Sequence, residues 1–156
     1  MTIRLRPLGD ADLDAVFRWE RDPAAAAMAA FTRDDPADRA AFDAHYRRVR
    51  ADPANLLLVI EDDGQAVGTI GSFTIDDERE VGFWIDPARW GRGIASAALP
   101  LFLEVELERP LHARAAAHNL GSAAVLQRAG FERVGSERSW AAAVGEEIVE
   151  HRYRLD

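Results

Sequence analysis

Residues 84–96 read Trp-Ile-Asp-Pro-Ala-Arg-Trp-Gly-Arg-Gly-Ile-Ala-Ser and place two glycines, Gly91 and Gly93, at the start of an apolar run. Glycine inside a helix costs roughly 1 kcal/mol relative to alanine, so two glycines here need a compensating role. A helix N-terminus exposes unpaired N–H groups and carries about half a positive charge. We therefore predict that the backbone of this loop approaches a phosphate group at the start of a helix.

The same glycines are also consistent with a plain turn into a helix. The spacing is not G-x-G-x-x-G, since Ala95 and Ser96 follow, and no G-K-[ST] occurs in the chain. A dinucleotide-binding oxidoreductase is therefore disfavoured. Arg89 and Arg92 add positive charge beside the loop in an otherwise acidic protein.

The composition narrows the class of protein. A length of 156 residues, 48% hydrophobic and 29% charged, is typical of one soluble domain spanning residues 1–156. The net charge of −8 disfavours a nucleic-acid partner. No apolar run approaches the ~20 residues of a membrane span, and the first residues lack a secretory-signal layout, so we expect a cytoplasmic protein without a membrane partner. The chain has no cysteine and no H-x-x-x-H pair, so we expect no metal.

Hydrophobic patterns along the chain predict a mixed α/β sheet. Strands are expected over residues 3–8, 56–60 (a buried central strand), 67–75, 80–85, 111–116, 131–135 and 148–155. Helices are expected over residues 10–20 with Asp10 as N-cap, over 36–50, and over 92–107 with Val105 in its apolar stripe. A further helix is expected from Asn119, as its N-cap, to Gly130. The alanine-rich residues 24–30 are consistent with either a helix or a mobile segment, and residues 139–147 are expected to connect the last two strands.

Two segments carry a resemblance to a known family. Residues 81–95, VGFWIDPARWGRGIA, resemble the acetyl-CoA loop Q/R-x-x-G-x-G/A, and residues 119–131, NLGSAAVLQRAGF, resemble the helix that follows the next strand. In both motifs and in their order, the chain resembles N-acetyltransferases of the GNAT superfamily, most closely the RimJ/RimL-like branch. This resemblance implies the GNAT-like acyl-CoA N-acyltransferase fold, with a mostly antiparallel sheet of about seven strands and about four helices. It also implies acetyl-CoA as co-substrate, a small-molecule amine or protein N-terminus as acceptor, and a monomer or homodimer.

The resemblance also implies a set of binding residues. The amides of Gly91, Arg92, Gly93, Ile94, Ala95 and Ser96 would hold the CoA pyrophosphate. The strand residues Phe83, Trp84 and Ile85 would pair with the pantetheine. Asn119 would reach the pantetheine, and Arg92 or Arg128 would meet the adenosine phosphates.

The sequence departs from the family pattern at two positions. Trp90 stands where the loop motif has Gln or Arg, so pyrophosphate binding would rest more on the backbone. Leu126 replaces the tyrosine often proposed to protonate the leaving thiolate, so Ser122 or water would serve as the acid, or none would be used. This loss also keeps open an alternative function, a non-catalytic acyl-CoA sensor on the same fold.

Acetyl transfer to an amine requires the neutral amine, so a carboxylate must remove a proton. Glu80, at the start of the strand leading to the loop, is the predicted base, with a solvated turn residue as the alternative reading. Glu61 is a weaker candidate base. Further candidates have ordinary structural roles as alternatives: Glu20 and Asp22 for the acceptor's charge, His118 as a proton shuttle, and Trp19, Phe31, Phe73 and Trp84 as walls of the acceptor cleft.

Overall fold

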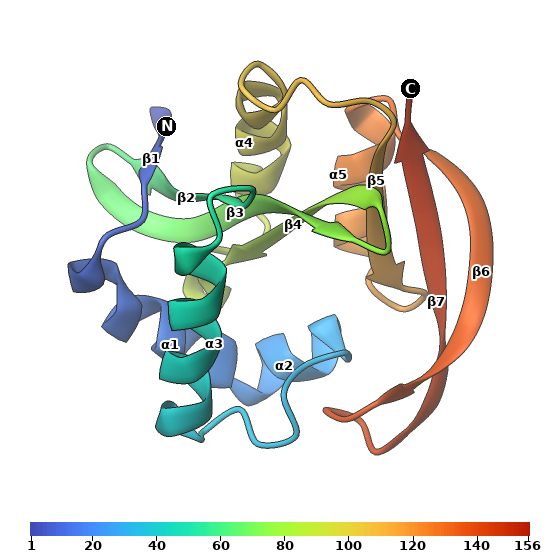
Figure 1. Cartoon of the computed structure of the whole chain (residues 1–156), viewed down its shortest axis with the longest axis horizontal. Coiled ribbons are helices and arrows are strands. Elements are labelled where there is room, and N and C mark those ends of the chain that lie inside the picture. The colour runs from blue at the N-terminus through green and yellow to red at the C-terminus, as the bar shows by residue number, and fades with distance from the viewer.

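Seven strands form one sheet in the order β1-β2-β3-β4-β5-β7-β6 in a computed structural model that describes residues 1–156. Figure 1 shows the N-terminal strands on one side of this sheet and β6 and β7 on the other. The strands are β1 (Ile3–Pro7), β2 (Leu56–Asp62), β3 (Gln65–Ile75), β4 (Glu78–Ile85), β5 (Leu111–Ala116), β6 (Glu132–Ala141) and β7 (Glu146–Leu155). The mixed α/β fold expected from the sequence is confirmed.

Five α-helices connect the strands, and none of them has the length and apolar composition needed to cross a membrane. They are α1 (Leu13–Arg21), α2 (Pro23–Ala29), α3 (Arg39–Ala51), α4 (Ile94–Leu103) and α5 (Leu120–Arg128). The alanine-rich segment is therefore a helix, α2, which Asp22 caps by accepting from the amide of Ala25 at 3.0 Å. Asp10 is not the N-cap of α1 as expected. It opens a 3-10 turn, Asp10–Asp12, because the Asp12 carboxylate is drawn back to the amide of Gly9 at 2.8 Å.

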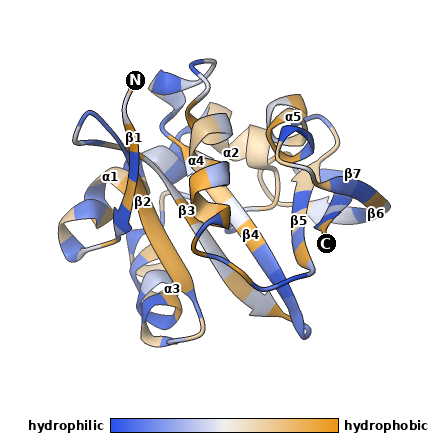
Figure 2. Ribbon diagram, turned by 90° about the horizontal axis from the view of Figure 1, so that it is seen from above, coloured by the Kyte–Doolittle hydropathy of each residue, from blue (hydrophilic) through white to orange (hydrophobic).

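The helices cover both faces of the sheet. On one face, α4 and α5 pack on the largest hydrophobic cluster, which includes Ile70 of β3, Leu99 of α4 and Leu126 of α5. On the other face, α1 and α3 enclose a smaller aromatic cluster against which Trp84 packs. Figure 2 shows the apolar character of β2 and of α4. Only Val59 and Ile60 of β2 are buried, so β2 is not the fully buried central strand expected, because it lies next to the edge strand β1.

The relation between β4 and β5 positions the site. β2, β3 and β4 form the expected antiparallel meander. By contrast, β4 and β5 run parallel and pair only at Arg79 with Leu111 and at Glu80 with His112. Beyond these residues the two ribbons diverge (Figure 1). The main-chain groups of β4 beyond Glu80 that point away from β3 therefore meet no partner on β5.

The lengths of α4 and of the last two strands differ from the sequence-based expectation. α4 ends at Leu103 rather than 107, because the buried carboxylate of Glu106 pairs with Arg79 and draws the chain onto the sheet. Val105 is consequently 58% exposed and does not belong to the apolar stripe. Residues 139–147 are not a mere connection, because β6 and β7 extend through most of them as a long hairpin. β6 is an edge strand with mostly exposed side chains, so it lacks the apolar alternation that would have revealed its length.

Candidate functional site

The glycine loop presents a row of free main-chain donors at the start of α4. The first amide that bonds back into the helix is that of Ala97, which donates to Gly93 O at 3.1 Å. The amides of residues 91–96 donate to no acceptor within the protein. Such a row of N–H groups at a helix N-terminus is an anion-binding arrangement.

The backbone conformation explains why both glycines stand in this loop. Gly91 has a φ of +77° and Gly93 a φ of +78°, which L-residues adopt only at a cost. A Cβ built at either position would meet no atom within 4 Å. The space above the amides is therefore open, and a side chain there would occupy the place where an anion must approach.

A cavity of about 660 Å³ lies against this loop, between β4, α4 and the start of α5, with α2 as a further wall. It is lined by every residue that the family resemblance marked for CoA: Phe83, Trp84, Ile85, Trp90, Gly91, Arg92, Gly93, Ile94, Ala95, Ser96, Asn119 and Arg128. The fold thus brings together residues from three separate elements.

The basic and aromatic side chains of the loop differ in the hydrogen bonds and ion pairs that they form within the protein. Arg128 of α5 donates to Ser96 Oγ at 3.3 Å, which places a guanidinium beside the free amides. Arg92 makes no hydrogen bond or ion pair within the protein, whereas Arg89 donates to Gln65 at 2.7 Å. The Trp90 indole donates to Ile85 O at 3.1 Å and so braces the loop against the end of β4.

Asn119 and Ser122 lie at the N-terminus of α5. The Asn119 side chain accepts from the amide of Ser122 at 3.1 Å and is therefore the N-cap of this helix, as expected. Both residues line the cavity. The Ser122 hydroxyl makes no hydrogen bond within the protein, and its role as an acid stays a prediction.

Glu80 lies on β4 as expected, but its carboxylate is held within the protein. The residue is only 5% exposed, and its carboxylate accepts from Arg114 Nε of β5 at 2.7 Å. It does not line the 660 Å³ cavity or a smaller cavity beside it. Its role as the base therefore stays a prediction, without a contact that supports it.

The other candidate polar residues are engaged in structural contacts. Glu61 accepts from Arg6 at 2.7 Å, and Glu20 pairs with Arg33 at 2.9 Å and with the hydroxyl of Tyr46. His118 lines the cavity, and its Nε2 lies 2.9 Å from Ala27 O, which ties α2 to the loop before α5.

The aromatic candidates divide between the core and the cavities. Trp19 is buried in the aromatic cluster and lines neither cavity. Trp84 packs on the same cluster and also lines the larger cavity. Phe31 lines the smaller cavity, and Phe73 lines neither.

Sequence reasoning missed Glu150 and the β5 residues of the smaller cavity, which measures about 190 Å³ and is also lined by the predicted residues Phe31, Phe83, Asn119 and Ser122. It is lined by residues of β4 and β5, by Ser122, by Leu126 at the position of the missing tyrosine, and by Glu150 of β7. Glu150 is 8% exposed, and burial together with the charges of Glu137 and Glu80 raises its pKa, although Arg114 opposes the shift. No local pattern marks Glu150, because only the β5–β7 pairing opposite Ala116 brings it to the site.

Comparisons with known proteins place the chain in a family. The acetyltransferase (GNAT) domain family matches residues 2–132. A structure of Mycobacterium smegmatis RimJ in complex with CoA-disulfide superposes with a TM-score of 0.80 at 25% identity, over 98% of this chain and 81% of that one. Spermidine N-acetyltransferase from Vibrio cholerae, in complex with CoA and spermine, gives 0.81 at 18% identity, over 98% and 94% of the two chains. A phosphinothricin acetyltransferase from Sinorhizobium meliloti, in complex with AcCoA, gives 0.82 at 19% identity, over 99% and 88%. A comparison with curated proteins gave no match. The chain belongs to the GNAT acetyltransferase family.

Proposed function

We propose that this protein is an acetyl-CoA-dependent N-acetyltransferase that moves an acetyl group to a primary amine by direct attack in a ternary complex. The observation that carries the proposal is the row of free amides at residues 91–96 beside a cavity that is also lined by Phe83, Trp84 and Ile85 of β4. A diphosphate satisfies such donors, and a pantetheine arm satisfies an unpaired strand edge.

The residues of the cavity fit acetyl-CoA along its length. The loop amides would hold the pyrophosphate, with Arg92 and Arg128 as mobile cations beside it. The β4 edge around Phe83 would pair with the pantetheine amides. Asn119 and Ser122 would face the sulfur, since they line both the cavity and the gap between the strands.

When bound, acetyl-CoA supplies an acetyl thioester, and the protein supplies the position and the charge control. A β4 amide can donate to the carbonyl oxygen as it gains negative charge. A carboxylate takes a proton from the acceptor ammonium, and Glu80 is the residue that the family resemblance suggests. With no cysteine in the chain, an acyl group on a protein thiol is excluded, so direct attack is the simplest scheme.

The acceptor we propose is a small-molecule amine or a protein N-terminus. Among the structural relatives are enzymes named for spermidine, for phosphinothricin and for ribosomal-protein alanine. We assign the chain to the RimJ/RimL-like side of the family on the loop and helix motifs. The acidic net charge of −8 is consistent with a cationic acceptor.

A second candidate function is an acyl-CoA sensor without catalysis, which the buried Leu126 at the tyrosine position favours. The test is to incubate the protein with acetyl-CoA and a panel of peptides, polyamines, phosphinothricin and aminoglycosides, and to measure free thiol. Amine-dependent thiol release supports the acetyltransferase. Calorimetric binding of acetyl-CoA without thiol release on any amine supports the sensor, and absence of binding contradicts both.

A further inference from the structure

The smaller cavity lies in the gap where β4 and β5 diverge, and we call it the passage. Consecutive residues line it, Val81 to Phe83 on β4 and Ala113 to Ala116 on β5. Neighbouring residues of a strand point to opposite faces of a sheet. A cavity lined by consecutive residues of two diverging strands therefore adjoins both faces of the sheet.

This passage is continuous with the cavity assigned to acetyl-CoA. Both cavities are lined by Phe83, Asn119, Ser122 and Ala29. The passage thus leads from the end of the CoA site away from the glycine loop to the face of the sheet that α1 and α3 cover. An acceptor that enters from that face reaches the thioester without displacing CoA.

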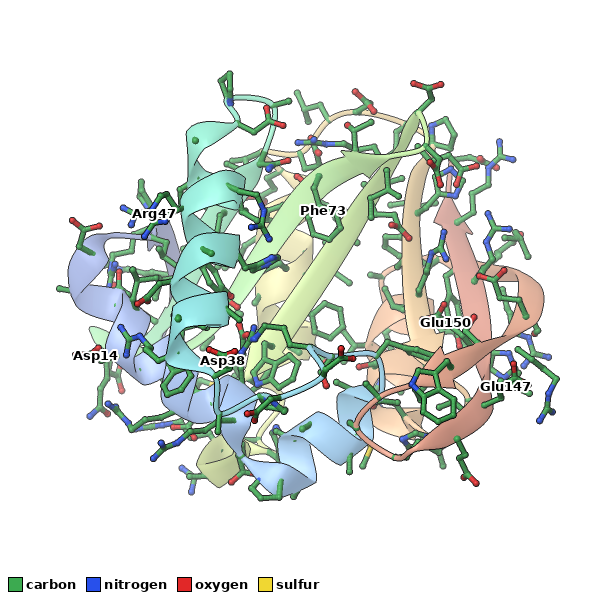
Figure 3. All side chains as sticks on the ribbon, turned by 60° about the horizontal axis from the view of Figure 1, so that its bottom comes forward. Asp14, Asp38, Arg47, Phe73, Glu147 and Glu150 are labelled. Atoms are coloured by element: carbon green, nitrogen blue, oxygen red, sulfur yellow. The ribbon has the colours of Figure 1, made fainter.

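Glu150 of β7 lines the passage, and it lies opposite Ala116 of β5. Figure 3 shows it on β7, with Phe73 of β3 on the other side of β4 and β5. Glu150 is 8% exposed, and the one cation beside its carboxylate, Arg114, is shared with Glu80 and Glu137. Its nearest cationic atom is Arg114 Nη1 at 3.7 Å, beyond hydrogen-bond length. A buried carboxylate in this state has its lone pairs free for a ligand in the cavity.

The charges around Glu150 favour a cationic ligand. Arg114 of β5 already donates to Glu80 of β4 at 2.7 Å and to Glu137 of β6 at 3.0 Å. Arg152, two residues along β7, pairs with Glu78 at 3.4 Å instead. The carboxylates of Glu80, Glu137 and Glu150 therefore share one guanidinium. The ammonium group of a ligand would supply a second positive charge beside them.

We propose that Glu150 binds the ammonium group of the acceptor in this passage and takes its proton, in place of Glu80. The inference rests on the proposed acetyltransferase function. Glu80 is directed to Arg114 and lines neither cavity, whereas Glu150 faces the cavity where the acceptor nitrogen must lie.

Glu150 accepts one proton from the ammonium, and the nitrogen lone pair then forms a bond to the acetyl carbon. The carbon–sulfur bond breaks, and its electron pair leaves on the thiolate of CoA. The second proton lost by the nitrogen ends on that thiolate through water, and Glu150 releases its own proton to solvent. The net products are the acetamide, CoA and one proton.

The test does not require the natural acceptor. S-aminoethyl-CoA carries a primary ammonium just beyond the sulfur, and S-propyl-CoA is its uncharged counterpart of the same size. Their affinities are measured by calorimetry at neutral pH for wild type, Glu150→Gln and Glu137→Gln. Glu137 is the matched control, because it contacts the same guanidinium and lines neither cavity.

We expect wild type and Glu137→Gln to bind S-aminoethyl-CoA about tenfold or more tightly than S-propyl-CoA. Glu150→Gln should bind the two ligands equally and keep wild-type affinity for S-propyl-CoA, which also shows that it folds. The role of Glu150 is overturned if wild type binds the two ligands with equal affinity, or if Glu150→Gln still prefers S-aminoethyl-CoA. Failure of wild type to bind S-propyl-CoA contradicts the proposed function itself.

Discussion

Glu80 and Glu150 share the guanidinium of Arg114 unequally: Nε lies 2.7 Å from the Glu80 carboxylate, whereas Nη1 lies 3.7 Å from that of Glu150. The strand that sequence reasoning selected thus carries the tightly held carboxylate. The strand contributed by the C-terminal hairpin carries the carboxylate that faces the cavity.

This difference predicts distinct pH profiles. Glu150 must be ionised to accept a proton, so wild-type kcat/KM falls as pH decreases through its raised pKa. In Glu150→Gln only the neutral amine reacts, so the loss is largest near neutral pH and shrinks toward the amine's own pKa of about 10. Initial rates with an alkyl amine that turns over in the panel measure this. A loss of kcat/KM in Glu150→Gln that does not depend on pH would contradict the role of Glu150 as the base. A pH-dependent loss of kcat/KM found in Glu80→Gln alone would return that role to Glu80.

The glycine loop allows a matched test of ligand access. Gly93→Ala and Gly64→Ala should each cost about 1–2 kcal/mol of stability, because both positions have positive φ. A Cβ at Gly64 or at Gly93 meets no protein atom within 4 Å, but only Gly93 lines the cavity. We expect acetyl-CoA affinity to drop at least about tenfold in Gly93→Ala alone. Equal affinities of the two variants in calorimetry would contradict the anion site.

The capping role of Asn119 can be separated from its proposed contact with the pantetheine. Asn119→Ser keeps a side-chain oxygen at the N-cap of α5, whereas Asn119→Ala loses it at a cost of about 1 kcal/mol. If the amide also contacts the pantetheine, both variants should bind acetyl-CoA more weakly, while only Asn119→Ala unfolds at lower urea concentration. If Asn119→Ser binds acetyl-CoA as tightly as wild type does, the role of Asn119 is limited to capping α5.

The buried pair of Arg79 and Glu106 predicts a stability that depends on pH. Burial alone would raise the pKa of Glu106, but hydrogen bonds from Arg79 and Ser72 and the Arg79 charge lower it overall. The ionised Glu106 carboxylate therefore stabilises the folded protein fully above the ordinary carboxyl pKa. This stabilisation is lost as the pH falls through the lowered pKa of Glu106. Arg79→Met leaves Glu106 buried without its cation and should cost about 3–5 kcal/mol at neutral pH.

Urea unfolding at neutral and at acidic pH measures this cost, which should shrink at acidic pH as Glu106 takes up a proton. Arg50→Met is the control, since Arg50 pairs with an exposed Asp10 at 2.6 Å and should cost at most about 1 kcal/mol. A cost in Arg79→Met no larger than in the control would show that the buried pair does not stabilise the fold.

Local sequence signals predict those parts of the site that lie within one loop or one helix turn. The glycine pair, the apolar residues that follow it and the Asn119 cap each act within one loop or helix turn, and the structure has them where the sequence predicts. Glu150 is different, because its position follows from the pairing of β7 with β5 across a long stretch of chain. The exposed edge strand β6 gives no apolar alternation, so the hairpin that carries Glu150 could not be delimited from sequence.

The binding of a diphosphate by the amides of residues 91–96 is tested most directly by NMR. Correlation spectra of ¹⁵N-labelled protein are recorded as acetyl-CoA is added. We predict that the amide protons of Gly91 and Gly93 and of the other loop residues move downfield more than any others, since they form charge-assisted hydrogen bonds, while Gly64 and Gly145 stay in place. Saturable shifts elsewhere, with the loop amides unmoved, would contradict the account.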